Sequence, residues 1–182
     1  RDSLRELFII NLLHGCLSPA EIEEKQSELE MEGWFTGIRF AVIEVDDFFD
    51  HAEQYRRQKR QQLYYFKLWQ TIDRILHDSA EICPLFFVKV ENARFCCGFR
   101  RERIPEPLFL DNSQHLIQRC KSMGISVTVA VEPNVESVEG LTRAFEQCSY
   151  MLRFKYSMGK GIVLYVNDIP GASEMASYPS VV

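Results

Sequence analysis

The sequence predicts a mixed α/β domain in which a central five-stranded sheet is flanked by helices. Apolar residues recur at helical spacing in five segments, and short apolar or alternating runs form five others. In chain order these read helix, helix, strand, helix, strand, strand, helix, strand, helix and strand. Two strands follow each other directly, and a hairpin between helical crossovers indicates one mixed sheet with helices on its faces.

The first two helices have clear boundaries. The first is predicted over residues 2–14 and ends at Gly15, with an apolar face made of Leu4, Leu7, Phe8 and Leu12. The second begins at Ser18, which we expect to be the N-cap, with Pro19 at the first helical position and Glu21 completing a capping box. It runs to about Met31, and Gly33 ends it.

Three further helices are predicted over residues 50–77, 113–123 and 138–157, the second of them capped by Ser113. The strands are predicted over residues 39–45, 85–90, 94–99, 125–131 and 162–166. The predicted organisation is an N-terminal helical extension (1–33), a central α/β domain (34–168) and a linker (169–182). A start without Met inside a helical pattern suggests that the chain is a fragment of a longer protein.

Composition excludes several classes of protein. Hydrophobic residues make up 46% of the chain and charged residues 26%, as in ordinary globular domains. A net charge of -5 argues against direct nucleic-acid binding, and the basic run Arg56–Arg60 is interpreted as a solvated helix face. The apolar runs are too short to cross a membrane.

The six cysteines lack the close pairing typical of zinc sites. We expect them to be buried, reduced thiols of a cytoplasmic protein. Cys96 and Cys97 are adjacent in a predicted strand, so their side chains are expected on opposite faces of the sheet.

Acidic residues gather where the first predicted strand ends, at Glu44, Asp46, Asp47 and Asp50. Carboxylates in such a position can hold a divalent metal ion, with Glu44 and Asp46 as its contacts. The alternatives are a solvated strand end, in which Asp47 and Asp50 cap the following helix, or a site for another ligand. His51 lies nearby but is interpreted as a surface residue.

The segment Ser157–Gly161 has a superficial likeness to a phosphate-binding loop. It lacks the required spacing and follows a helix instead of preceding one. A turn that ends a helix is the better interpretation.

The element order and the stretch Ile43-Glu-Val-Asp-Asp-Phe48 resemble the GGDEF domain of diguanylate cyclases, a nucleotide-cyclase-like palm. In that family the strand ends in a pattern like L-D-I-D-x-F. The resemblance places Glu44 at the position of a metal-ligand aspartate, so Glu44 and Asp46 would form a vestigial metal or nucleotide site.

The family's signature belongs at the hairpin turn, where this chain has Glu91-Asn92-Ala93-Arg94-Phe95. Only the phenylalanine agrees. Both glycines that allow backbone to approach the nucleotide are replaced, and Ala93 or Arg94 replaces the metal-facing acid. A cation there would repel Mg²⁺. The R-x-x-D inhibitory motif upstream is also missing. The resemblance therefore implies a degenerate domain with no catalytic residue, resident metal or cofactor.

A second resemblance covers most of the chain. The segments Leu4–Glu21, Ser137–Cys148 and Phe154–Asp168, followed by Tyr178-Pro179, are similar to the middle domain of YesN-type response regulators of the AraC class. Related membrane-bound AraC-class regulators carry the same segment in the cytoplasm. The resemblance implies a signal-relay domain of a transcription regulator in two-component or sensory signalling, with its DNA-binding part outside this sequence.

We therefore expect a non-enzymatic cytoplasmic domain that couples an upstream signal or dimerisation to DNA binding elsewhere. A homodimer is expected, with Leu7, Ile10 and Leu13 as candidate contacts, and neither nucleic acid nor membrane is expected to contact this part directly. The first alternative is residual binding of GTP or cyclic di-GMP, or diguanylate cyclase activity. The second is a sensor of a small metabolite, for which the sequence names neither pocket nor ligand.

Overall fold

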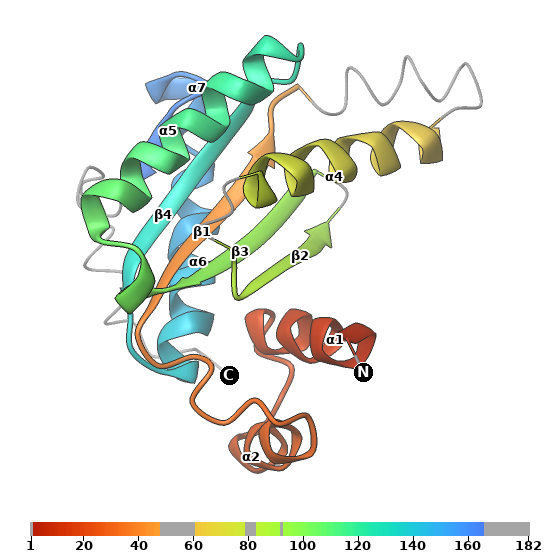
Figure 1. Cartoon of the computed structure of the whole chain (residues 1–182), viewed down its shortest axis with the longest axis vertical. Helices are drawn as coiled ribbons and strands as arrows, with labels where there is room; N and C mark the ends of the chain where they lie inside the picture. Colours follow the sequence, from red (N-terminus) through yellow and green to blue (C-terminus); the bar gives the residue numbers. More distant parts are fainter. Residues whose placement is uncertain (1, 48–60, 79–82, 92, 166–182) are drawn as a thin grey trace.

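The computed structural model describes residues 2–47, 61–78, 83–91 and 93–165. In them, one sheet has the strand order β2-β3-β1-β4-β5 (Figure 1). Central β1 is antiparallel to both of its neighbours, β2 and β3 form an antiparallel hairpin, and β4 and β5 are parallel. The predicted class, a mixed five-stranded sheet flanked by helices, is confirmed. The strands are β1 Ile38–Val45, β2 Phe86–Glu91, β3 Arg94–Arg100, β4 Val127–Val135 and β5 Val163–Tyr165.

Helices pack against both faces of this sheet, and two separate apolar cores result. Helices α1 (Asp2–Leu13) and α6 (Val138–Leu152) contribute to one core. Helices α4 (Gln61–His77) and α5 (Glu106–Ser122) contribute to the other. The shorter elements are α2 Pro19–Glu28, the 3₁₀ turn η1 Arg101–Arg103 and α7 Lys155–Met158.

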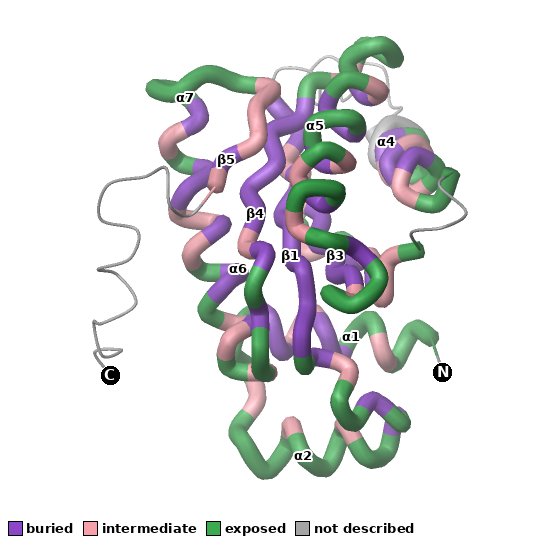
Figure 2. The backbone as a smooth tube through the Cα atoms, turned by 60° about the vertical axis from the view of Figure 1, so that its left-hand side comes forward, coloured by how far each residue is buried: buried purple, intermediate pink, exposed green. Residues whose placement is uncertain are grey.

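The central strand β1 supplies both cores in alternation. Phe40 and Val42 lie in the core of α1 and α6, whereas Ala41 and Ile43 lie in the core of α4 and α5. Because both faces are covered, β1 is buried along almost its whole length, as Figure 2 shows in purple. This explains its nearly continuous apolar sequence.

The cysteines follow the same alternation in part. Cys96 and Cys97 point into opposite cores, as predicted. Cys120 and Cys148 are buried too, and all six thiols are free. The prediction is wrong for Cys16 and Cys83, which are exposed because neither lies on a core-facing position of a helix or strand.

The hairpin depends on a glycine. Gly98 of β3 lies directly opposite Phe86 of β2, and the phenyl ring covers the glycine backbone. A Cβ atom at position 98 would overlap this ring. Glycine is therefore required here for close approach of a neighbouring strand's side chain.

Helix boundaries agree with the sequence where local capping decides them. Ser18 and Glu21 form the predicted capping box of α2. The predicted start of α5 is wrong: the helix begins at Glu106, because a proline in the first turn is favourable there. Ser113 is consequently inside the helix, and its Oγ donates a hydrogen bond of 2.9 Å to the Phe109 carbonyl oxygen.

Two further differences concern the ends of α6 and β4. Helix α6 ends at Leu152 instead of continuing to residue 157, and the separate short helix α7 follows. Strand β4 runs on to Val135, because β1 continues to pair with it as far as that residue. The predictions for Asp50, His51, Arg56–Arg60, Asn92 and the linker 169–182 lie outside the described residues.

Helix α1 does not present the apolar face expected from the sequence. Its side chains Phe8, Ile9, Leu12 and Leu13 are buried, whereas Leu4 and Leu7 are 59% and 55% exposed. Leu13 is 1% exposed and belongs to the same core as β1, so its assignment as a dimer contact is corrected. Ile10 is partly buried against that core.

Candidate functional site

The predicted acids lie where β1 ends, between β3 and β4. The strand register places Glu44 opposite Arg94 of β3 and Thr128 of β4. The Glu44 side chain keeps 15% of its surface exposed, while the Asp46 side chain has none. The structure therefore brings Glu44 and Asp46 into one largely enclosed site.

Asp46 is held by a hydroxyl group of β4 and by that of Ser126, the residue directly before this strand. Thr128 Oγ1 donates a hydrogen bond of 2.8 Å to Oδ1, and Ser126 Oγ donates one of 2.6 Å to Oδ2. The Asp46 backbone N–H donates to the Ser126 carbonyl oxygen at 2.9 Å. Thr128 Oγ1 in turn accepts a hydrogen bond of 3.1 Å from the Gly161 backbone N–H. The carboxylate is thus fixed in position by β4.

A lysine ammonium group lies between the two acids. Lys155 Nζ is 2.6 Å from Glu44 Oε1 and 3.2 Å from Asp46 Oδ1. Its side chain is 4% exposed, and it projects from the first turn of α7, just after α6 ends. Lys155 therefore supplies a positive charge at the place where the acids were predicted to hold a metal ion.

Arg94 occupies the other side of Glu44. Its Nη2 and Nε donate to Glu44 Oε2 at 2.5 and 3.0 Å, and its Nη1 lies 3.4 Å from Ser149 Oγ of α6. A cation at this position is expected to repel Mg²⁺. The structure adds that the guanidinium group binds the very carboxylate predicted as a metal contact.

The four charged groups form a neutral cluster, which we call the Lys155 cluster: Glu44, Asp46, Arg94 and Lys155. Burial by itself would lower the pKa of Lys155, but hydrogen bonds and charge from Glu44 and Asp46 outweigh it and raise that pKa. The ammonium group therefore stays charged at neutral pH. These residues do not fit a divalent cation, because two oxygens that would bind it are already bound to Nζ.

The other described residues of the predicted signature turn are Glu91, Ala93 and Phe95. Phe95 is fully buried, and its ring stacks on Phe87 with the ring centres 5.6 Å apart. The Ala93 carbonyl oxygen accepts a hydrogen bond of 2.8 Å from the Val45 backbone N–H. Glu91 is exposed at the end of β2. Of the described residues of this turn, only Arg94 reaches the Lys155 cluster.

The segment Ser157–Gly161 ends a helix, as predicted. The Gly159 backbone N–H donates to the Lys155 carbonyl oxygen at 2.9 Å, and Gly159 has a φ of 104°. Lys160 forms an ion pair with Asp47, the acid that follows the cluster in sequence. The Ser157–Gly161 turn and the acid Asp47 thus lie at the same end of the sheet.

Two features of the described residues concern metal ions and membranes. No group of three or more His, Cys, Asp and Glu side chains in that part of the chain is arranged to hold a metal ion. None of its helices is long and apolar enough to cross a bilayer.

Comparison with solved structures gives a distant likeness of fold. The chain is similar to a solved structure of an EAL/GGDEF domain protein from M. capsulatus, with 14% identical residues and a TM-score of 0.45. The similarity covers 74% of this chain and 86% of the other. No protein-family model matches the chain, and no curated protein matches it.

Sequence reasoning missed three members of the site. Ser126 lies directly before β4 and Thr128 lies within it; they are polar residues two positions apart in an extended apolar segment, and this spacing directs both side chains to the same side. It could have identified them as partners for a buried polar group. Lys155 gave no comparable signal, because a lysine near the end of a helix is usually solvated.

Proposed function

We propose that this chain is a non-catalytic signal-relay domain of an AraC-class transcription regulator, built on a degenerate GGDEF-like scaffold. The observation that carries the proposal is the position of Lys155 Nζ between Glu44 and Asp46. The positive charge at this position is the ammonium group of a lysine side chain and not an exchangeable cation.

The chemistry of nucleotide condensation supports this proposal. Transfer of a phosphate-linked nucleotide relies on divalent metal ions that neutralise phosphate charge and activate the attacking oxygen. Mg²⁺ requires near-octahedral oxygen ligands, and Glu44 and Asp46 are already bound by Lys155, Arg94 and two hydroxyl groups. Metal binding would have to displace a buried lysine and leave that charge without a partner.

Relay through dimer contacts is the second part of the proposal. Leu4 and Leu7 are exposed on α1 and line a groove of about 260 Å³ between α1 and α2. A groove lined by exposed apolar side chains is a surface on which a second protein chain can pack. Leu7, with Ile10 partly buried beside it, is our candidate contact of a homodimer whose formation biases a DNA-binding part elsewhere. We place the domain in the cytoplasm, without direct contact to nucleic acid or membrane.

The test of lost catalysis is direct. The purified chain is incubated with GTP and either Mg²⁺ or Mn²⁺, an active diguanylate cyclase serves as the positive control, and products are separated by chromatography. We expect no cyclic di-GMP from this chain and no heat of binding for GTP in calorimetry. Product that disappears in the Glu44→Gln variant would refute the proposal and favour the residual-cyclase alternative.

A specific observation also favours the second alternative, a small-metabolite sensor. A cleft of about 510 Å³ lies between α4 and α5, away from the Lys155 cluster. Its volume is within the range of natural small-molecule sites, roughly 300–1,000 Å³. Sensing and relay are compatible, because a ligand in this cleft would contact two helices on one face of the sheet.

A further inference from the structure

The cleft between α4 and α5 has an apolar floor. Ile75 of α4, Leu116 of α5 and Phe99 of β3 line it, and each is less than a tenth exposed. The Phe99 ring packs edge to face on Phe109, with centres 5.9 Å apart, which holds its orientation. The floor continues into a cavity of about 30 Å³ that is also lined by Phe99 and Leu116. This part of the cleft suits a flat or branched apolar group.

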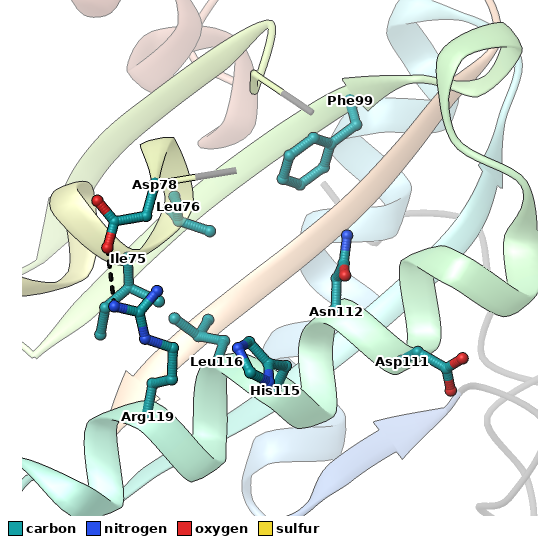
Figure 3. A pocket seen from close by; sticks show the side chains of 9 residues that line it. All are labelled: Ile75, Leu76, Asp78, Phe99, Asp111, Asn112, His115, Leu116 and Arg119. Carbon is teal, nitrogen blue, oxygen red and sulfur yellow. Dashed lines mark hydrogen bonds and ion pairs between the residues drawn. The ribbon is translucent and has the colours of Figure 1, made fainter. Parts of the chain in front are cut away.

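Polar groups line one wall of the cleft and come from a single helix. Asn112, His115 and Arg119 are spaced three and four residues apart on α5, so they lie along one face of it (Figure 3). Asn112 is half-buried, and Figure 3 shows its amide directed toward Phe99. Within the described part of the chain, neither Asn112 nor His115 has a hydrogen-bond partner. Both are therefore available to a ligand.

Arg119 is the positive charge of the cleft. Its Nη2 donates to Asp78 Oδ2 at 2.7 Å, and the two side chains are 39% and 44% exposed. An exposed ion pair of this kind contributes only about 0–1 kcal/mol. A carboxylate on a ligand can consequently replace Asp78 at little cost, and it would gain a planar arginine partner with His115 one turn away.

The acids around the cleft limit the charge of that ligand. Asp78 lies at one end of the cleft, and Asp111 lies at the other and is exposed. Among the described residues that line the cleft, Arg119 is the only arginine or lysine, so a molecule with two or more negative charges would be repelled. Nucleotides and cyclic dinucleotides are disfavoured for this reason.

We propose that the α4–α5 cleft binds a small organic monocarboxylate with an aromatic or branched apolar body. The apolar body lies on Phe99, Ile75 and Leu116, the carboxylate binds Arg119 with His115 beside it, and the Asn112 amide contacts a polar substituent. A bound ligand contacts both α4 and α5 and thereby links the two helices. The biological meaning of this contact rests on the proposed relay function, whereas the binding itself does not.

Phenylacetate is the probe that tests the proposal, in a titration of the isotope-labelled chain followed by NMR. We expect saturable shifts at Leu76, Phe99 and Asn112. The Arg119→Gln and Asn112→Leu variants should each weaken binding, the first by about tenfold. Arg143→Gln, an exposed change on α6 against the other face of the sheet, is the matched control and should bind normally.

Several results would overturn this inference. They are equal binding of phenylacetate and phenethylamine, unchanged binding by Arg119→Gln, or binding of cyclic di-GMP but not of phenylacetate. An absence of shifts at millimolar phenylacetate would do the same. These results leave the proposed function intact, whereas turnover of GTP would refute the proposed function without affecting the cleft.

Discussion

Lys155 Nζ lies 2.6 Å from Glu44 Oε1 in a nearly closed site at the end of the central strand. This contact joins α7 to β1, and it determines what the acidic strand end can do. A carboxylate that is neutralised by a buried lysine contributes to the fold, and it is not available as a ligand for an exchangeable cation.

The first prediction concerns the stability that Lys155 provides. Replacing it by methionine keeps the volume but leaves Glu44 paired with Arg94 alone and removes the ammonium group that pairs with buried Asp46. We expect Lys155→Met to lower the free energy of unfolding by about 3 to 5 kcal/mol, measured by urea denaturation. Lys160→Met removes an exposed ion pair of the same turn and should change stability little. Equal losses in both variants would contradict the assignment of Lys155 as a structural cation.

The second prediction concerns metal ions. Lys155→Ala removes the ammonium group and leaves a space beside two carboxylates. We expect Mg²⁺ or Mn²⁺ to raise the melting temperature of this variant and to leave that of the unmodified chain unchanged, because a ligand stabilises only a folded state that binds it. Adding Glu44→Gln should abolish the gain. If metal stabilises the unmodified chain equally, Lys155 does not occupy the cation position.

The third prediction concerns alkaline pH. Burial raises the pKa of Cys97 from the ordinary 9.0 to about 12 and that of Cys120 to about 11, and it raises the pKa of Cys96 and Cys148 well above 9.0. The unfolded chain therefore loses these protons first, and stability falls as the pH rises above 9. The limiting slope is about 1.4 kcal/mol per pH unit for each thiol.

The Lys155 ion pairs act in the same direction at higher pH. The pKa of Lys155 is raised above the ordinary 10.5. The ion pairs therefore contribute fully to stability below pH 10.5, and this contribution is lost as the pH rises through the folded-state pKa of Lys155. Urea denaturation at a series of pH values from about 8 to about 11 measures the effects of the buried thiols and of the Lys155 ion pairs. Cys97→Ala should reduce the slope between pH 9 and its folded pKa of about 12, and an unchanged slope would contradict burial as its cause.

The fourth prediction separates the two faces of α1. Leu7→Asp changes an exposed side chain, so the free energy of unfolding should hardly change, while sedimentation should show loss of the proposed dimer. Leu13→Ala should instead cost about 2 to 5 kcal/mol through a core cavity and leave the association surface in place. A chain that stays monomeric at high micromolar concentration would refute the dimer.

Local patterns determined the fold class of this protein. The nearly continuous apolar runs of β1 and β3, the short turn between β2 and β3, and the Ser18 capping box each depend on residues a few positions apart. The start of α5 was predicted wrongly because two helix-start signals competed, a proline near residue 106 and a serine at 113. The proline position prevailed, since the helix gained two more turns against the sheet.

The acids Glu44 and Asp46 and the altered hairpin at Arg94 were also identifiable from the sequence, because strand ends and turns are local features. Only the tertiary structure decided their chemistry. Lys155 reaches the acids because α6 ends at Leu152 and the next turn crosses the end of the sheet. No local rule encodes that meeting, since it depends on how α6 packs on β4. Because the packing buries Asp46 with Lys155 beside it, the acidic strand end became an internal ion pair.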